Sequence, residues 1–541
     1  MSRPSIKSYS QDKTPSGYHY RSRFIIEDAN NALVNSIRRA CMSMVPTVAF
    51  DSTWHDDKHE RSIVFDVNTS ALHNEWLADR ISLCPIRMTG NKELSIRSAW
   101  NSATHQRDFE FRNPELVPIF QIELKNDKTT SDRLDVNGYI KMTTDDFTVS
   151  STSDGNKVVH RLHRFLPHDP FTDYPILLNK LKNNVNEDAG EEVRCICRPR
   201  VGTGRTHARH DPTGTVTYEF AVTKNEAEIR KVFRDRIEWI NSEHKKVGDN
   251  GGKPLPPLTP DEIAAEEKSF NLLDRARVYE RRPDGTAQAI KMSVESIGGL
   301  EPDQIVYDAL TSLDLAIQDC LSCVSLTKEP RIGFTADTEK VEVTAIKGSA
   351  YGVYIHLKNE EHTLGNLIAD YTKRLYAQGD GFGKELVLFS KVAYSMPHPL
   401  EKKVVIVYDY PTLSTEPSNP LPINLLLAKV INKYYSEVYG TPLDIKVNEL
   451  SAMEYVQIVA VISFIRVCNM IRQDISRLLT EWSNHTKITG ESFEVADEKE
   501  WLFRNVNNIT LVPETVEAVY AEPATTAPAT KKPAKPRTRK Q

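Results

Sequence analysis

Two cysteines and two histidines in the middle of the chain have the types and the spacing of a zinc site. Cys195 and Cys197 precede His207 and His210, with nine residues between the pairs. Two thiolates and two imidazoles form a common tetrahedral zinc site. The alternative is a strand whose two cysteines point to opposite faces, followed by a loop that carries two histidines. We favour this alternative, because a ligand pair at that spacing needs a turn, and we predict no metal ligands.

Two further motifs carry residue types with known chemistry. Cys320-x-x-Cys323 has the spacing of a redox or metal pair, but Leu321 and the apolar pattern around it favour packing within a helix. Gly202-x-Gly204 with Arg205 could hold a phosphate, yet it lacks the strand–turn–helix context of phosphate loops. We interpret it as a protein-contact loop. Since no paired acidic motif for two-metal catalysis stands out either, we predict no catalytic residue and no cofactor.

Composition narrows the class of protein further. The 541 residues correspond to several domains of about 150 residues each. A net charge of −5 argues against a general DNA coat, since non-specific DNA binding depends on excess positive charge. No uninterrupted apolar run reaches the ~18 residues of a membrane helix, so we predict no membrane association. Seven cysteines spread over this length fit reduced thiols.

The elements that would position these residues follow one plan twice. The plan is a strand, an amphipathic helix, further strands and a long helix. In the first half these are a strand at 18–27, a helix at 28–44 and a helix at 302–326. In the second half they are a strand-like segment at 341–357, a helix at 361–376 and a helix at 451–484 that starts with a capping box, Ser451 and Glu454. The two shorter helices share Leu, Asn and Ile at an offset of 331 residues.

The remaining segments have different compositions. Residues 1–17 are polar and predict a flexible start. Residues 88–200 are β-rich, and 191–218 predicts two strands around a Gly-rich loop. Residues 225–283 form a charged insert with helical patterns at 226–245 and 261–281. The segment 521–541 is basic and rich in Ala and Pro, which is typical of disorder.

Four segments of the first half resemble the alpha-like family of RNA polymerase subunits. That family holds the bacterial alpha amino-terminal domain, the larger of the two archaeal alpha-like subunits and the third subunit of eukaryotic RNA polymerase II. The segments are NTSALHNEWLADRISLCPI (68–86), NALVNSIRR (31–39) with VPT (45–47), GTGRTHAR (202–209) and VESIGGL (294–300). In the second half, EHTLGNL (361–367) and YSMPHPL (394–400) resemble the smaller archaeal alpha-like subunit and the eleventh subunit of RNA polymerase II.

The resemblance implies an α+β fold with two alpha-like dimerisation modules in one chain, each a sheet packed with long helices. A third-subunit-like domain would occupy 18–90 and 190–326, with the charged helical insert at 225–283. An inserted β-rich module would occupy 88–190, and an eleventh-subunit-like domain 336–484. An extension and a disordered basic tail would occupy 485–541. The cysteine cluster that binds zinc in some eukaryotic relatives is missing from the inserted module.

The resemblance also implies a role and its residues. The role is a non-catalytic assembly platform of a DNA-directed RNA polymerase. The chain would not be an enzyme by itself and would have no cofactor. The expected subunit-pairing interface consists of Leu33, Ile37, Met44, Leu364, Ile368, Tyr371, Leu310 and Ile317. The residues expected to dock the large subunits are Asn35, Arg38, Arg39, Arg80, Gly204, His207 and Arg209.

The expected partners are the two largest polymerase subunits and small accessory subunits. DNA would be contacted only through the complex, and no membrane association or homo-oligomer is expected. Fused forms resemble those of large nucleocytoplasmic DNA viruses. This resemblance implies a viral polymerase, in the virion or in the host cytoplasm or nucleus where viral transcription occurs. The alternative is a stand-alone interaction or transcription-regulatory protein that reuses the alpha-like fold. A zinc-dependent enzyme at Cys195 and His207 is a third hypothesis.

Overall fold

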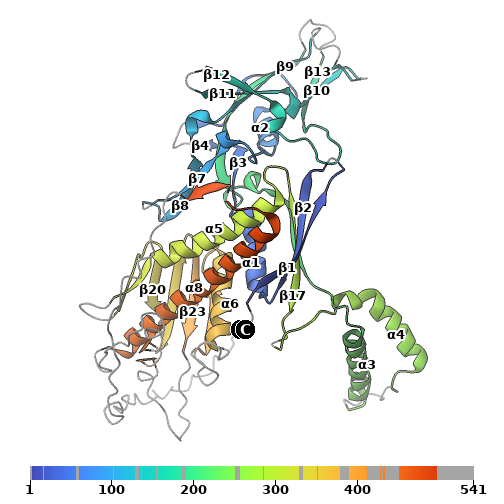
Figure 1. Cartoon of the computed structure of the whole chain (residues 1–541), viewed down its shortest axis with the longest axis vertical. Helices are drawn as coiled ribbons and strands as arrows, with labels where there is room; N and C mark the ends of the chain where they lie inside the picture. Colours follow the sequence, from blue (N-terminus) through green and yellow to red (C-terminus); the bar gives the residue numbers. More distant parts are fainter. Residues whose placement is uncertain are drawn as a thin grey trace, which may run out of the picture.

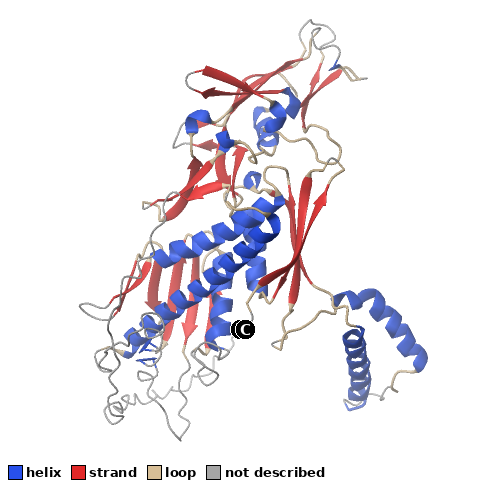
Figure 2. Ribbon diagram, viewed as in Figure 1, coloured by secondary structure: helices blue, strands red, loops and turns tan. Residues whose placement is uncertain are grey.

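The computed structural model contains two antiparallel four-stranded sheets with the same topology (Figures 1 and 2). Their strand orders are β1-β2-β17-β16 and β20-β21-β23-β22. Each sheet and its helices form one unit, in which the chain runs through a hairpin, a helix, two further strands and a long helix. The first set is β1 (Ser5–Lys13), β2 (His19–Glu27), α1 (Asn31–Ser43), β16 (Thr213–Phe220), β17 (Ala289–Ser296) and α5 (Pro302–Ser322). The second set is β20 (Val341–Ala345), β21 (Gly352–Lys358), α6 (His362–Thr372), β22 (Lys391–Ser395), β23 (Lys403–Asp409) and α8 (Ala452–Thr486).

The structure describes the chain from residue 3 to residue 495 with internal gaps. The gaps are 16, 56–59, 102, 128–132, 136, 154–155, 184–189, 250–255, 284, 328–332, 350, 378–388, 411–426, 429–430, 433–449 and 491. The predicted basic tail at 521–541 therefore lies outside the described residues.

The repeat extends to single residues in the turn before each short helix. Asp28 follows β2 with φ 58°, and Asn359 follows β21 with φ 60°. Their backbone N–H groups donate to Gln288 O (2.8 Å) and Lys402 O (2.6 Å), each directly before the third strand of its sheet. Asp and Asn tolerate this left-handed conformation better than most residues. The offset of 331 residues seen in the helices therefore also relates the turns that start them.

Local capping fixes where the helices begin. The Asn30 side chain accepts from Leu33 N at 2.6 Å and caps α1. The predicted capping box of α8 is confirmed, since Ser451 N donates to Glu454 Oε2 (2.7 Å) and Glu454 N donates to Ser451 Oγ (3.3 Å). Both caps satisfy N–H groups that a helix leaves unpaired.

The β-rich module is built around a five-stranded sheet of order β12-β11-β9-β14-β6. Two of its strands, β6 and β14, lie outside the predicted range 88–190, so the sheet recruits chain from both flanks. Helix α2 packs beside it. The module's main elements are β6 (Ile63–Asn68), α2 (Asn74–Ser82), β9 (Ile119–Lys125), β11 (Phe147–Ser153), β12 (Asn156–His160) and β14 (Glu192–Cys197). Two-stranded sheets accompany it: β10 (Tyr139–Thr143) with β13 (Leu177–Lys182), β3 (Pro46–Phe50) with β15 (Pro199–Thr203), and β4 (Trp54–His55) with β5 (Glu60–Arg61).

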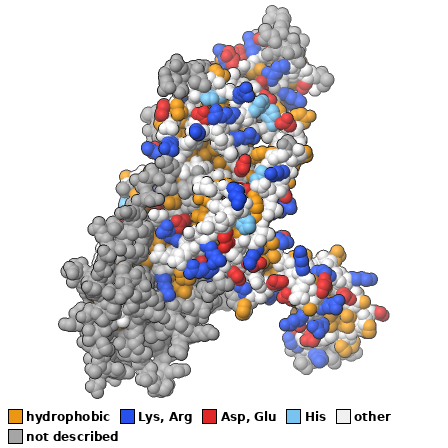
Figure 3. Space-filling view, viewed as in Figure 1, with side chains coloured by type: hydrophobic (Ala, Val, Ile, Leu, Met, Phe, Trp, Pro, Cys, Tyr) orange, Lys and Arg blue, Asp and Glu red, His pale blue; other side chains and the backbone are white. Residues whose placement is uncertain are grey.

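The charged insert is a pair of helices that projects from the end of β16 and β17 (Figure 1). It contains α3 (Glu226–Asp249) and α4 (Pro260–Leu273) around a small apolar cluster of Ile229, Phe270 and Val278. Lys/Arg and Asp/Glu side chains are interspersed over its surface (Figure 3). The predicted second helix, 261–281, is too long, because the chain after Asp274 returns to the sheet: Thr223 N donates to Val278 O at 2.9 Å.

Three further predicted segments differ from the structure. Residues 5–13 form edge strand β1 rather than a flexible start, because pairing with β2 uses backbone groups and needs little apolar side chain. Helix α5 ends at Ser322, and 324–327 forms β18, which pairs with β19 (Gly333–Ala336). The region 191–218 contains three strands rather than two, β14, β15 and β16.

The extension after α8 returns to the inserted module. Strand β24 (Phe493–Val495) pairs in parallel with β7 (Ile96–Asn101), whose other neighbour is β8 (Gln106–Phe111). The Phe493 ring packs edge-on against Phe109, with centroids 5.8 Å apart. Residues predicted as a separate extension therefore complete a three-stranded sheet.

Helix α8 is the largest apolar element. It is long and apolar enough to cross a membrane, but 72% of its most apolar window is buried within the protein. Near its C-terminal end, Trp482 is fully buried, contacts the rings of Tyr9 and Phe24 (5.4 and 4.7 Å between centroids) and donates to Asp303 O at 2.9 Å. α8 thus contacts both sheets.

Replacing Trp482 with Ala should lower the free energy of unfolding by about 3–5 kcal/mol, because it removes a buried indole and leaves a cavity. Denaturant unfolding followed by far-UV circular dichroism measures this change. Trp239→Ala is the matched control, since Trp239 is 62% exposed on α3, and its effect should stay within about 0.5 kcal/mol. Equal effects of the two substitutions would contradict the packing described for α8.

Candidate functional site

The four helices α1, α5, α6 and α8 form a closed ring of contacts between the two sheets. α1 packs against α5 and α6, and α8 packs against the same two helices. We call these four helices the helical seam. On one side α1 and α5 cover the sheet that contains β2, and on the other α6 and α8 cover the sheet that contains β21. The seam is therefore where the two repeated units meet.

The expected pairing residues lie in this seam. Leu33, Ile37, Leu364 and Ile368 are at most 1% exposed, on α1 and α6. Leu310 and Ile317 of α5 are at most 2% exposed, and Tyr371 of α6 is 7% exposed. Met44, which caps the end of α1, is partly buried against the same core. All eight expected residues thus pack in one continuous core.

Polar contacts cross the seam between its apolar faces. Arg39 Nε donates to Thr363 Oγ1 at 2.8 Å, and Ser36 Oγ donates to Thr363 O at 3.4 Å. These contacts join α1 to the first turn of α6. Between α5 and α8, Arg472 binds Asp314 with two hydrogen bonds of 2.8 and 3.0 Å. Such directional contacts fix how the helices are aligned along one another.

Tyr371 and Asp474 provide a further polar contact, between α6 and α8. The Tyr371 hydroxyl donates to Asp474 Oδ2 at 2.9 Å. Burial, with Asp474 beside it, raises the pKa of Tyr371 well above its usual value, and burial raises the pKa of Asp474. The hydroxyl therefore stays protonated and keeps donating.

The Gly-rich loop at 202–209 lies against the seam and contacts the second unit. Arg205 Nε donates to Glu361 Oε1 (2.9 Å), Arg205 Nη2 donates to Asn359 O (2.8 Å), and Arg205 N donates to Ser43 O (3.0 Å). Arg205 therefore joins the end of α1 to the start of α6. From the sequence this loop was expected to contact a large subunit, which stays a prediction, and the contacts of Arg205 within the chain were not predicted.

Both glycines of this loop are required by close approach. A Cβ on Gly204 would lie 2.0 Å from Met42 O, and a Cβ on Gly202 would lie 2.6 Å from His210 Nε2. Burial, then the neighbouring Arg209, lowers the pKa of His210 to about 4. Near neutral pH the His210 ring is therefore uncharged where it packs on the β3–β15 pair.

The expected docking residues divide into two groups. Arg80 and His207 are exposed, and Asn35 and Arg38 are half-buried on α1; a docking role for these four stays a prediction. The other three have contacts within the chain, as Arg80 also does through a hydrogen bond from its Nη2 to Leu177 O (3.1 Å). Arg209 is buried and paired with Asp51, Arg39 binds Thr363, and Gly204 is closed off by the backbone of α1. The side chains of Arg39 and Arg209 are thus engaged within the chain, and a docking role for these three residues likewise stays a prediction.

The cysteines and histidines near residue 200 do not assemble into one ligand set. Cys195 and Cys197 are both buried on the same face of β14, so the expectation that they point to opposite faces is wrong: residues two apart in a strand share a face. A hydrogen bond with Cys195, together with burial, raises the pKa of Cys197. Among the residues that the structure describes, one group brings three possible metal-binding side chains together, and it lies elsewhere. Cys320 and Cys323 are buried at the end of α5.

Buried ion pairs next to the seam were not predicted from the sequence. Lys340 Nζ lies 2.6 Å from Glu360 Oε1, both nearly buried. Burial alone would lower the pKa of Lys340, but Glu360 raises it above its usual value. Arg107 of β8 binds Asp319 of α5 (Arg107 Nη2 to Asp319 Oδ1, 2.6 Å). The partners in each pair are distant in sequence or lack a regular spacing, so only the fold reveals that they pair.

Comparison with known proteins assigns the first unit to a family. Residues 23–315 match the RNA polymerase Rpb3/Rpb11 dimerisation domain. The chain is 25% identical over 311 residues to subunit 3 of DNA-directed RNA polymerases II, IV and V of Arabidopsis thaliana, covering 54% of this chain and 84% of that protein. It is 23% identical over 297 residues to RNA polymerase II subunit RPB3 of Schizosaccharomyces pombe, covering 54% and 79%. An archaeal relative, subunit Rpo3 of Methanopyrus kandleri, is 27% identical over 120 residues, or 18% and 40%.

The match spans more than half of the chain and includes the second half of β2, all of α1, β16 and β17, and most of α5. The chain therefore belongs to the RNA polymerase Rpb3/Rpb11 dimerisation domain family. Within it, similarity to subunit 3 makes this an alpha-like subunit of the multisubunit RNA polymerase type.

Ile37→Asp or Ile368→Asp should separate the two units, because each would bury an unpaired carboxylate at a cost of several kcal/mol. The measurement uses a protease site inserted within 328–332, between β18 and β19. After cleavage, the two fragments should co-elute in size-exclusion chromatography for the otherwise unchanged protein and separate for either variant. Val232→Asp, on the exposed face of α3, is the control and should co-elute. Co-elution of both seam variants would overturn the pairing role of these residues.

Arg205→Ala should weaken association of the same cleaved fragments by about 1.5–3 kcal/mol, since it removes hydrogen bonds to a carboxylate and a carbonyl. This corresponds to roughly tenfold or more in the dissociation constant. Arg205→Lys should not restore the affinity, because an ammonium lacks the planar fork that reaches both acceptors. Arg277→Ala is the control, since the Arg277 side chain is 80% exposed. An unchanged dissociation constant for Arg205→Ala would show that the loop does not join the units.

Proposed function

We propose that this chain is a non-catalytic assembly platform of a multisubunit DNA-directed RNA polymerase, in which a third-subunit-like and an eleventh-subunit-like module are fused. One observation carries the proposal: the unit that matches the dimerisation-domain family packs, through the helical seam, against a second unit of the same topology. The resemblance of EHTLGNL and YSMPHPL to the eleventh subunit supports the identity of the second module.

The seam explains the advantage of a fusion. The paired faces of α1 and α6 are apolar, and separate modules would expose them until they met. Within one chain, pairing becomes intramolecular at an effective concentration on the order of mM. The ratio of the two modules is then fixed at one to one, and each is kept from pairing with its own kind.

The proposed partners follow from the pairing of two different modules. One module is proposed to bind the second-largest polymerase subunit and the other the largest, with small accessory subunits alongside and DNA contacted only through the complex. Among the proposed docking residues, Arg80 and His207 are the two that are exposed. The fusion also supports a source in a large nucleocytoplasmic DNA virus, with transcription in the virion or in the host cytoplasm or nucleus.

Co-expression with the two largest subunits of the source polymerase tests this function. The tagged chain should recover both subunits in a one-to-one-to-one complex. Arg80→Glu should lower that recovery at least about tenfold, because it reverses a charge at the proposed contact, while Arg277→Glu on the insert should leave it unchanged. Quantitative mass spectrometry of the purified complex gives the ratios.

One outcome would contradict the proposed function, and another would contradict the proposed role of Arg80. A folded, soluble chain that recovers neither large subunit would favour a stand-alone interaction or regulatory protein. Equal recovery by Arg80→Glu and Arg277→Glu would remove Arg80 from the docking surface.

A further inference from the structure

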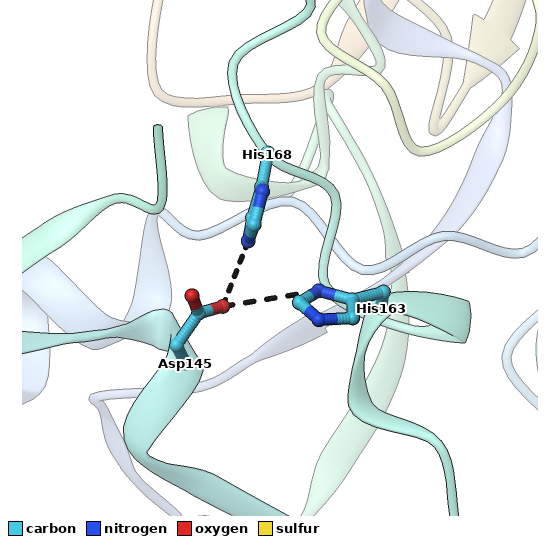
Figure 4. Close-up of side chains that lie close together, drawn as sticks. All are labelled: Asp145, His163 and His168. Atoms are coloured by element: carbon cyan, nitrogen blue, oxygen red, sulfur yellow. Dashed lines mark hydrogen bonds and ion pairs between the residues drawn. The ribbon is translucent and has the colours of Figure 1, made fainter. Parts of the chain in front are cut away.

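Three side chains capable of binding a metal meet on the inserted β-rich module, and none of them belongs to the cysteine and histidine motif considered above. Asp145, His163 and His168 place one ligand atom each within 4.8 Å of one another (Figure 4). Asp145 Oδ1 lies 2.8 Å from His168 Nε2 and 3.8 Å from His163 Nδ1. The two imidazole rings are 4.7 Å apart between centroids, at 83°. One oxygen and two nitrogens therefore converge from separate turns.

The turn that carries Asp145 is held by its neighbours. Asp146 closes a capping box by accepting from Thr143 N at 2.7 Å, and its carboxylate also binds Arg133 at 2.7 Å. On the other side, Thr144 N donates to Ile176 O at 3.0 Å. The Asp146 carboxylate therefore binds Thr143 N and Arg133. The Asp145 carboxylate faces the two histidines instead.

Both turns are anchored on the same buried aromatic ring. Phe147 follows Asp145 by two residues and Phe165 follows His163 by two, and both are almost fully buried. Each packs edge-on against Phe120, with centroids 6.1 and 5.8 Å apart. The separation of Asp145 and His163 is therefore set by the core of the module rather than by surface side chains alone.

His168 is oriented by a second carboxylate. Its Nδ1 lies 3.2 Å from Asp173 Oδ1, so its Nε2 is directed at Asp145. A carboxylate on the far nitrogen of an imidazole is the usual arrangement around metal-binding histidines, because it fixes the ring and its tautomer. His168 is 19% exposed, compared with 40% for Asp145 and 67% for His163. The group is therefore open to solvent on one side.

We propose that Asp145, His163 and His168 form a binding site for one divalent transition-metal ion of the zinc class. Two imidazoles and one carboxylate suit zinc and its neighbours, whereas magnesium and calcium prefer oxygen ligands only. Three protein ligands leave coordination positions for water. An ion there would link the turn after β10 to the segment 161–169. The proposal is independent of the polymerase function, since the site lies outside the helical seam.

Metal titration of the full-length, tag-free protein after chelation tests the site. Co²⁺ should bind at one ion per chain with d–d absorption, and Zn²⁺ should displace it. Asp145→Asn and His163→Ala should each weaken binding at least about tenfold, since each removes a ligand. Asp173→Asn should weaken it roughly 10- to 100-fold through the orientation of His168. His73→Ala, an exposed histidine outside the group, should leave binding unchanged.

Folding is controlled in the same samples by near-UV circular dichroism. His163 is the most exposed ligand, so His163→Ala should keep the native spectrum while losing the ion. Equal Co²⁺ affinity of the unchanged protein and Asp145→Asn would overturn the site, as would an absence of one-to-one binding. Binding that is lost only with Cys195→Ser or Cys197→Ser would place the ion elsewhere and would equally overturn it.

Discussion

Burial of the apolar faces of α1, α5, α6 and α8 against one another is the interaction on which the rest of the structure depends. Each sheet is covered on one face by its own pair of helices, and each pair has a second apolar face that its own unit cannot cover. At about 25 cal/mol per Å² of apolar area removed from water, a continuous core through all four helices supplies most of the free energy that holds the units together. The sheets, the Gly-rich loop and the inserted module are all placed relative to that core.

Charged contacts at the edges of the core determine alignment rather than strength. Arg205 with Glu361, Lys340 with Glu360, and Arg107 with Asp319 lie where loops and strands meet the seam. Buried ion pairs contribute little net stability, because desolvation offsets the attraction between the charges. Removing one partner is costly, however, since the other charge stays buried and unpaired. These pairs thus favour one placement of the Gly-rich loop, the inserted module and the start of β20 against the helices.

Periodicity predicted the helices of the seam, because their buried faces recur every three or four residues: Leu33 and Ile37, and Leu364 and Ile368. The capping box at Ser451 was equally readable, since it depends on residues three apart. Strand β1 could not be predicted, because SIKSYSQDK is mostly polar and pairs through its backbone. The group at Asp145, His163 and His168 has no regular spacing, and only the fold of the inserted module brings it together. Cys195 and Cys197 were predicted to point to opposite faces, although the two-residue period of a strand places them on the same face.

Strand β24 completes the sheet of β7 and β8 only late in synthesis of the chain. Its partner β7 belongs to the inserted module, which leaves the ribosome long before residues 493–495 do, since synthesis runs from the N-terminus. Until then one edge of β7 has unpaired backbone groups, the kind of edge to which other chains can add. The same delay applies to Trp482, which fills the space beside Tyr9 and Phe24. A chain that stops early therefore carries an exposed strand edge and an open apolar hollow, features by which chaperones and proteases can distinguish it from a finished molecule.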